Sequence, residues 1–264
     1  MTRHADIAQM TLAQIREFLR DPGDVAPEVM DLLRQDPRRG ALDVWRSLRS
    51  RQKRRRRAKR RLDELLHLER GLHRTGARAI AGLDEAGRGP LAGPVVAAAV
   101  ILPRPCEWLG LDDSKRLTSK ERQEYARHIM ANATAVGRGV VAAARIDRVG
   151  IVQATWEAMH QALAGLSTEP DHLLVDGPFP LPAVSIPQTP LVKGDARSLS
   201  IAAASVVAKV TRDGIMRRLA DKYPQYGFRR HKGYGTPEHL AALHCHGPCP
   251  VHRRSFRRVC EVRA

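Results

Sequence analysis

Four carboxylates in this chain stand at the ends of apolar runs, where a buried charge needs a partner. Asp84 and Glu85 follow the run AIAGL, Asp176 follows HLLV, and Asp195 follows PLVKG. A carboxylate at the end of a buried strand is unfavourable unless it is paired or ligates a cation. Acids that converge at neighbouring strand ends would hold hard divalent cations through oxygen ligands. Two such ions would suit phosphoryl transfer, because they stabilise both the attacking water and the leaving oxygen.

The same acids have a plainer interpretation, which their spacing leaves open. Asp followed by Gly, as at residues 176 and 177, is a common turn sequence. Acids also cap helices by accepting hydrogen bonds from backbone N–H groups. Spacing alone therefore does not decide between metal ligands and turn formers.

Other motifs of catalytic or metal-binding chemistry fail on their details. The segment GLDEAGRG resembles a phosphate-binding loop in its spacing, but Arg88 and Gly89 stand where that loop needs Lys and Ser or Thr. His239 and His244 are five residues apart, whereas a zincin helix places its two ligands four apart. The run HCHGPCPVH, 244 to 252, crowds its Cys and His residues into one stretch, unlike the two separated ligand pairs of structural zinc sites. We favour a rigid surface turn there over a metal site.

The overall charge indicates a polyanionic partner. Lys and Arg number 45 against 28 Asp and Glu, which gives a formal net charge of +17 at pH 7 over 264 residues. The basic residues are densest at 53 to 61, where only Ala58 is neither Lys nor Arg. Such a run repels itself unless an anion lies alongside, so we favour nucleic acid binding over a solvated helix face or linker.

The apolar runs and the cysteines indicate the compartment. The longest uninterrupted apolar run, residues 95 to 102, is far shorter than the roughly 20 residues of a membrane helix. The first residues lack the apolar stretch of a secretory signal, and the 4 cysteines are too few for a disulfide scaffold. We therefore expect a cytoplasmic protein with no membrane partner.

Two patterns divide the chain into a helical and an α/β part. Up to residue 74, short amphipathic and Pro-punctuated segments lead into the basic run, which predicts a helical N-terminal extension. Beyond it, short apolar segments alternate with helical stripes, which is typical of an α/β domain. Strands are expected at residues 79–83, 95–102, 136–144, 172–175 and 183–186, with Leu191 and Val192 as a continuation of the last.

Helix signals fill the gaps between these strands. Thr118 and Glu121 form a capping box, and Thr236 followed by Pro237 opens a later helix. The segment 198 to 220 begins with small residues and ends basic, so its first turns can lie very close to other backbone.

On these elements, six strings of the sequence resemble the ribonuclease HII family. They occur in that family's order and cover most of residues 79 to 259: LDEAGRGPLAGPVVAAAVIL, DDSKRLTSKER, IVQATWEAM, LLVDG, KGDARSLSIAAASVVAKVTRD and HKGYGTPEH. The resemblance implies an α/β, RNase H-like fold with a mixed central sheet flanked by helices. We expect three parts: a basic helical extension (1–74), the catalytic core (75–227) and a C-terminal helical segment that closes over the substrate groove (228–264).

The resemblance also implies an activity and its catalytic residues. The family cleaves the RNA strand of RNA/DNA hybrids and cuts 5′ to single ribonucleotides in duplex DNA, leaving 5′-phosphate and 3′-hydroxyl ends. This chemistry serves ribonucleotide excision and primer removal. The family's catalytic, metal-binding acids correspond to Asp84, Glu85, Asp176 and Asp195, the same four that end the apolar runs. The expected cofactor is Mn²⁺ or Mg²⁺, with two ions during catalysis.

Substrate recognition is assigned by the same resemblance. Only the 2′-hydroxyl distinguishes a ribose from its deoxyribose neighbours, and the family's GRG segment, here Gly87, Arg88 and Gly89, contacts it. Tyr234 corresponds to a tyrosine that stacks on the adjacent deoxyribose, and Lys115 to a lysine near the phosphate backbone. Taken without the resemblance, Tyr234 would be a surface anchor and Lys115 a solvated loop lysine. The expected partners are RNA/DNA hybrid and ribonucleotide-containing duplex DNA, bound by a monomer.

Two other functions compete with this interpretation. A non-catalytic basic nucleic-acid-binding protein would use the positive charge alone and keep the acids as structural residues. A different two-metal nuclease, such as a junction resolvase, would ignore the 2′-hydroxyl. An all-DNA control substrate separates the second of these from a ribonuclease.

Overall fold

The computed structural model describes residues 7 to 20, 25 to 111 and 117 to 263. The chain divides into two compact units, Met1–Arg61 and Leu62–Ala264. This division lies earlier than the boundary after residue 74 that we expect from the sequence. No helix within the described ranges is both long enough and apolar enough to cross a membrane.

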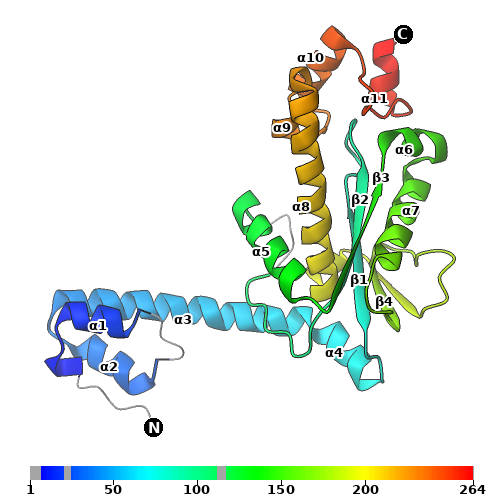
Figure 1. Cartoon of the computed structure of the whole chain (residues 1–264). Helices are drawn as coiled ribbons and strands as arrows, with labels where there is room; N and C mark the ends of the chain where they lie inside the picture. Colours follow the sequence, from blue (N-terminus) through cyan, green and yellow to red (C-terminus); the bar gives the residue numbers. More distant parts are fainter. Residues whose placement is uncertain (1–6, 21–24, 112–116, 264) are drawn as a thin grey trace. The chain divides into compact units, whose positions relative to one another are not determined.

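The first unit is a small helical body. Its elements are η1 (Ile7–Gln9), α1 (Leu12–Phe18), α2 (Pro27–Gln35) and most of α3 (Arg39–Leu65). The helices α1 and α2 pack along the first part of α3 (Figure 1), where Ile15, Leu33 and Leu48 are buried together. The basic residues 53 to 57 lie further along α3 and are exposed, so the predicted basic helix is confirmed for these residues.

The second unit is built on one five-stranded sheet. Its strands are β1 (Ile80–Ala86), β2 (Val95–Ile101), β3 (Ala135–Val141), β4 (His172–Asp176) and β5 (Gln188–Leu191). They lie in the order β3-β2-β1-β4-β5. The pairs β1–β2 and β2–β3 are antiparallel, whereas β1, β4 and β5 run parallel to one another. The expected α/β fold with a mixed central sheet is confirmed.

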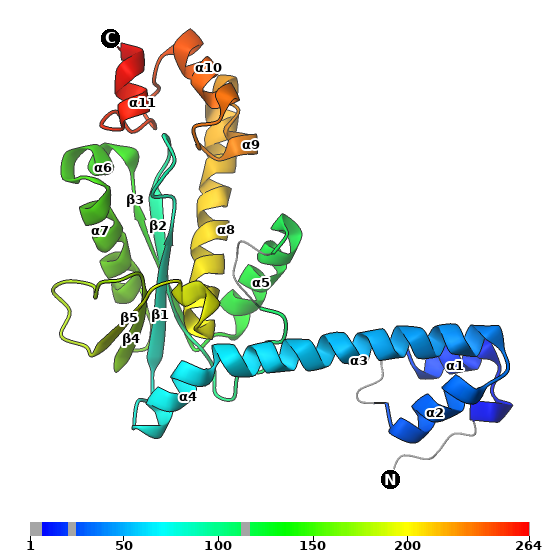
Figure 2. The same ribbon diagram turned by 180° about the vertical axis from the view of Figure 1, so that it is seen from behind.

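Helices cover both faces of this sheet. Those of the second unit are α4 (His67–Arg74), α5 (Ser119–Asn132), α6 (Ala143–Val149), α7 (Ile151–Ala164), α8 (Leu199–Lys222), α9 (Phe228–His231), α10 (Pro237–His246) and α11 (Arg257–Cys260), with short turns η2 (Gly194–Ala196), η3 (Pro224–Tyr226) and η4 (Glu261–Arg263). One face is covered by α7 and the other by α5 and α8 (Figures 1 and 2). Because both faces are covered, β2 is buried at every position and is apolar throughout.

Close packing of the helices depends on glycines in the strands. A Cβ atom on Gly82 would stand 2.2 Å from the backbone carbonyl carbon of Ser200 at the start of α8. A Cβ atom on Gly137 or Gly139 would stand 1.9 Å from a carbonyl oxygen of α7. The helices therefore lie directly on the sheet backbone, as the small residues at the start of the 198 to 220 segment predict for α8.

A buried carboxylate fixes α4 to the start of α8. Glu69 is 3% exposed, and its Oε1 accepts hydrogen bonds from the hydroxyls of Ser198 (2.6 Å) and Ser200 (2.8 Å). The Ser200 N–H donates to the same oxygen at 3.0 Å. These bonds explain why α4 belongs to the second unit, whereas hydropathy and charge place it with the basic segment that precedes it.

One predicted strand is wrong in position. Residues 183 to 186 form no strand, and the last strand is β5, which begins two residues later and includes only Leu191 of the expected continuation. Ala183 has φ of 57°, a left-handed conformation that no strand accepts. The Gln188 side chain closes the preceding loop by accepting from the Leu181 N–H (2.8 Å) and donating to the Leu181 carbonyl (2.9 Å).

We predict that Gly82→Ala destabilises the protein by about 3 kcal/mol, because the new methyl group meets rigid backbone rather than a movable side chain. The control is Gly71→Ala in α4, where an added Cβ atom meets nothing within 4 Å. That change should be neutral or stabilising by up to about 1 kcal/mol, since alanine is the better helix former. Urea denaturation measures both, and equal stabilities would contradict the packing argument.

Candidate active site

The sheet brings the sequence-selected acids to one edge. The strands β1, β4 and β5 are parallel neighbours, so their carboxyl ends lie at the same edge of the sheet. Leu83 pairs with Val175, which places Asp84 beside Asp176, one residue further along each strand. Asp195 lies in η2, directly after β5. Three separate apolar runs thus deliver carboxylates to one place.

Backbone and hydroxyl groups orient these carboxylates. The Gly194 N–H donates to Asp176 Oδ1 at 2.6 Å, which joins the turn that carries Asp195 to the end of β4. Asp84 Oδ1 accepts from the Glu85 N–H at 2.7 Å, and the Ser205 hydroxyl of α8 also donates to the Asp84 carboxylate. Asp84 and Asp195 are 5% and 4% exposed. Their positions are therefore set by the fold and not by solvent.

The acids oppose one another electrostatically. Burial, followed by the charges of Glu85 and Asp176, raises the pKa of Asp84 well above its ordinary value. Burial also raises the pKa of Glu85, whereas Arg88, whose Nη1 lies 3.4 Å from Glu85 Oε1, lowers it. Asp84 and Asp176 thus lie close enough to disfavour each other's ionisation.

A hard divalent cation fits this donor set. All four groups are carboxylates, the oxygen ligands that Mg²⁺ and Mn²⁺ prefer. Throughout the described ranges, no three His, Cys, Asp or Glu side chains converge on a common point as a coordination shell would. Donor chemistry and buried charge, rather than coordination geometry, support a cation here.

Two buried arginines hold the loop that follows β1. Arg253 is fully buried, and its guanidinium donates to the carbonyls of Gly87 (2.5 Å), Arg88 (2.8 Å) and Gly93 (3.0 Å). Arg212 of α8 is 1% exposed and donates to the carbonyls of Ala92, Pro94 and Lys232, each at 3.0 Å.

Burial and the neighbouring guanidinium lower the pKa of Arg253 to about 9, so it stays charged at neutral pH. The loop between residues 87 and 94 is therefore fixed by charge-assisted hydrogen bonds to its backbone.

The two glycines of the GRG segment differ in what the structure requires of them. Gly87 has φ of 99°, and a Cβ atom there would stand 2.1 Å from Arg212 Nε. Gly89 has no such φ, and a Cβ atom there would meet nothing within 4 Å. Folding thus requires glycine at 87 but not at 89, which leaves open space on the exposed side of Gly89.

The loop that carries Tyr234 is hydrogen-bonded to the loop between residues 87 and 94. Leu91 N–H donates to the Gly233 carbonyl at 2.8 Å, and Tyr234 is 43% exposed between α9 and α10. Lys209 Nζ and the Arg212 guanidinium carbon each lie 5.9 Å from the centre of its ring. An exposed aromatic ring therefore stands next to the GRG loop in a positively charged setting.

Three buried histidines, His231, His239 and His252, form a cluster that contacts the backbone of Tyr234. His239 Nδ1 lies 2.9 Å from the Tyr234 carbonyl, which can only accept, so this nitrogen carries the proton. His239 Nε2 then accepts from His252 Nε2 at 3.0 Å, and His252 Nδ1 accepts from the Cys249 N–H at 3.0 Å. His231 stacks on His239 with ring centres 4.5 Å apart. The chain of bonds requires neutral imidazoles.

This cluster corrects the interpretation of the 244 to 252 run as a surface turn. Cys249 and His252 are buried, at 8% and 1% exposure, in the apolar cluster of the C-terminal helices. The sequence separates the three histidines by up to 21 positions, so no local spacing marks them as partners.

The other predicted residues are only partly located. Arg88 is exposed beside Glu85, and Lys115 lies outside the described residues. Sequence reasoning missed Arg212 and Arg253. In a chain with 45 Lys and Arg, nothing local distinguishes these two as the buried ones.

Known proteins resemble this chain over most of its length. Residues 81–259 match the family model Ribonuclease HII, and residues 11–73 match the Ribonuclease HII N-terminal domain. A Ribonuclease HII of Geobacillus kaustophilus (strain HTA426) is 53% identical over 235 residues, which cover 88% of each chain.

Solved structures agree with these matches. The ribonuclease H2 of Pyrococcus horikoshii OT3 is 26% identical with a TM-score of 0.60, over 70% of this chain and 97% of that one. The RNase HII of the PCNA:RNase HII complex from Archaeoglobus fulgidus is 27% identical with a TM-score of 0.58, over 68% of this chain and 96% of that one. The expected RNase H-like fold is confirmed.

The histidine cluster predicts acid sensitivity. Burial, then the neighbouring His239, lowers the pKa of His252 from 6.5 to about 4. Between these values the unfolded chain binds a proton that the native cluster does not, so stability is lost as the pH falls from 6.5 towards 4. We expect His252 to lower the free energy of unfolding by about 3 kcal/mol across this window, measured by urea titration as the difference between the unchanged protein and His252→Gln.

Two variants test the assignment of this pH dependence. His252→Gln should flatten the slope between pH 6.5 and 4. His244→Gln removes an exposed imidazole of α10 outside the cluster and should leave the slope as it is. An unchanged slope in His252→Gln would contradict the assignment.

Proposed function

Because the chain belongs to the ribonuclease HII family, it is a divalent-metal-dependent endoribonuclease that cleaves RNA in RNA/DNA hybrids, and we propose that Asp84, Glu85, Asp176 and Asp195 form its catalytic centre. One observation carries this assignment. Three parallel strands bring the buried Asp84 and Asp195 and the half-buried Asp176 to one edge of the sheet, where Asp84 and Asp176 repel each other. A non-catalytic nucleic-acid-binding protein would have no use for such a cluster.

The four carboxylates would hold Mg²⁺ or Mn²⁺, two ions during catalysis. Such ions supply Lewis acids that activate a water molecule and stabilise the leaving oxygen of an in-line displacement. The protein's own contribution is orientation: Ser205 and the Glu85 N–H fix the Asp84 carboxylate, and the Gly194 N–H fixes that of Asp176. The expected products carry 5′-phosphate and 3′-hydroxyl ends.

We also propose that the enzyme cuts 5′ to single ribonucleotides in duplex DNA, with the GRG segment contacting the 2′-hydroxyl. The open side of Gly89 supports this, because neither backbone conformation nor internal packing requires glycine there. A sugar brought close to the backbone at this position would need the missing side chain. Arg253 holds the carbonyls of Gly87 and Arg88, so the segment is rigid before substrate binds.

The remaining assignments complete the proposal. The exposed ring of Tyr234 would stack on the deoxyribose next to the ribonucleotide, and Lys115 would contact the phosphate backbone. The exposed basic residues 53 to 57 of α3 suit contact with the duplex. We expect a cytoplasmic monomer that acts in ribonucleotide excision and primer removal.

Cleavage assays test the catalytic assignment. With Mg²⁺ or Mn²⁺, the protein should cut an RNA/DNA hybrid and should cut 5′ to the single ribonucleotide of a DNA duplex, but leave all-DNA duplex intact. Asp84→Asn should lower the single-turnover rate at least about a hundredfold while duplex binding persists, since it removes a metal ligand and not a substrate contact. Full activity of this variant would disprove the assignment, and cleavage of all-DNA duplex would indicate a nuclease that ignores the 2′-hydroxyl.

The two glycines give a matched test of substrate recognition. Gly89→Ala should fold with an unchanged melting temperature but lose at least about tenfold in kcat/KM on the single-ribonucleotide duplex, because its methyl group occupies the space left for the sugar. Gly87→Ala should instead lower the melting temperature, because it collides with Arg212. Normal kcat/KM in Gly89→Ala would show that the sugar does not approach this position.

A further inference from the structure

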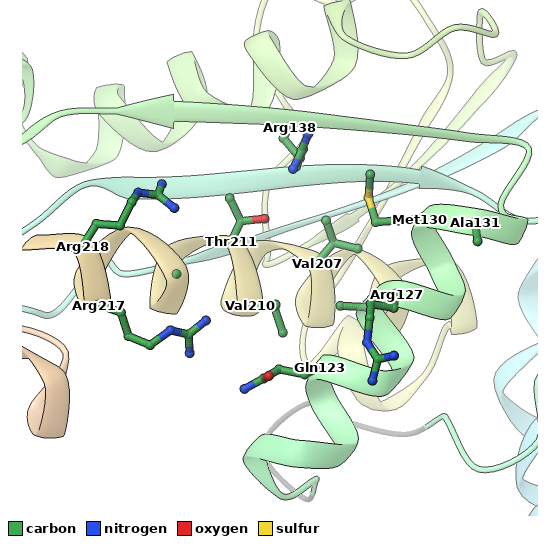
Figure 3. A pocket seen from close by; sticks show the side chains of 12 residues that line it. Gln123, Arg127, Met130, Ala131, Arg138, Val207, Val210, Thr211, Arg217 and Arg218 are labelled. Atoms are coloured by element: carbon green, nitrogen blue, oxygen red, sulfur yellow. The ribbon is translucent and has the colours of Figure 1, made fainter.

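A groove lined by arginines lies between α5, β3 and α8. Its volume is about 620 Å³. Arg127 of α5, Arg138 of β3, and Arg217 and Arg218 of α8 line it (Figure 3), together with the polar side chains of Gln123 and Thr211. Val207 and Val210 of α8 and Met130 of α5 also line it, and no carboxylate of the described residues does. The groove thus combines an apolar floor with four positive charges.

These four guanidinium groups have no anionic partner among the described residues. Within the part of the chain that the structure describes, none of them forms an ion pair or a side-chain hydrogen bond. Other arginines of the same unit do pair, for example Arg145 with Glu157 at 2.7 Å and Arg70 with Asp63 at 2.9 Å. The positive charge of the groove is therefore left for a ligand from outside.

The groove and the candidate catalytic acids lie on opposite flanks of α8. Asp84 pairs with Ala98, and Ala98 pairs with Arg138, so the three lie in one row across the sheet and point to the same face. Two strand spacings separate Asp84 from Arg138, about 10 Å. The helix α8 runs over this row, with Ser205 on the acid side.

The helical repeat confirms this separation. At about 100° per residue, Thr211 and Arg218 lie about 120° and about 140° around α8 from Ser205. Both line the groove, whereas Ser205 bonds to Asp84. The groove is therefore a site of its own, one helix thickness away from the acids.

We infer that this groove binds backbone phosphates of the nucleic acid duplex, away from the phosphodiester that is cut. Each strand of a duplex carries one phosphate per about 3.4 Å of axis, so the phosphates next to the one held at the acids lie within about 10 Å of it. A duplex placed on the acid flank of α8 thus presents phosphates within reach of the other flank. Arginine forks donate two parallel hydrogen bonds to phosphate, which suits the lining.

An acidic protein segment is the competing occupant. Nucleic acid is favoured because the groove adjoins the site that acts on it, and because a hybrid substrate is itself a polyanion. The inference rests on the family's action on nucleic acid, but not on which acids are catalytic. Binding without metal therefore tests it separately from cleavage.

The test compares two double variants with the same change in charge. Arg127→Glu/Arg217→Glu reverses two charges on the two helices of the groove. Arg74→Glu/Arg104→Glu reverses two exposed arginines outside it, at the end of α4 and in the loop after β2. Fluorescence anisotropy with an RNA/DNA hybrid in chelator gives Kd at several salt concentrations, and thermal melting confirms that both variants are folded.

We expect the groove variant to raise Kd at least about tenfold more than the control and to lower the salt slope of log K by about two. Its single-turnover cleavage rate at saturating hybrid should stay within about twofold of the unchanged protein. Arg127→Lys/Arg217→Lys should restore most of the affinity. Equal Kd values in the groove and control variants would overturn the inference, as would a large loss of the saturated cleavage rate.

Neutral linkages in the hybrid identify the phosphates concerned. Replacing blocks of phosphates by methylphosphonates, away from the scissile bond, should weaken binding of the unchanged protein at one block. The same block should have no further effect on the groove variant, because the two changes remove one interaction. If the groove variant instead loses binding to a polyglutamate probe and keeps its hybrid affinity, the groove is a protein-binding surface and the inference is wrong.

Discussion

The arrangement of the site depends on two guanidinium groups buried beneath the loop that follows β1. Arg253 and Arg212 bond to backbone carbonyls between residues 87 and 94, and Arg212 also bonds to the Lys232 carbonyl. Burying two such charges is unfavourable unless their donors are satisfied, so this loop cannot move without exposing an unpaired cation. The GRG segment and the Tyr234 loop are thereby held together as one rigid surface.

Beside these two buried arginines lies the cluster of carboxylates at the sheet edge. This local negative charge explains how a basic protein would hold cations next to a nucleic acid. The overall charge of +17 attracts a polyanion. The same positive charge repels metal cations, so local acids are needed to hold cations at the scissile phosphate. Parallel strands solve this by delivering Asp84 and Asp176 to one edge, where burial and mutual repulsion raise the pKa of Asp84. The fold thus places the acids that we propose as metal ligands at the sheet edge, and α8 separates them from the arginine groove.

The neutral histidines add a second constraint on the same surface. His239 forms hydrogen bonds to the Tyr234 carbonyl and to His252. The backbone that carries the exposed Tyr234 ring is therefore held by a hydrogen-bond network in which both imidazoles must be neutral. The apolar cluster of the C-terminal helices encloses these bonds. The predicted sensitivity to acid and the position of the tyrosine therefore have the same physical origin.

The sequence by itself determined the alternating layout, the capped helix after Thr118, and the four acids at the ends of apolar runs, because these depend on local periodicity and on the cost of burying charge. It misplaced the last strand, since the left-handed Ala183 leaves no trace in hydropathy, and it assigned Cys249 and His252 to the surface. Only the tertiary structure decided which arginines are buried and which stay unpaired in a groove. In a chain with so many basic residues, that difference depends on contacts between segments more than 100 positions apart, such as Arg253 with Gly87, and local sequence carries no record of them.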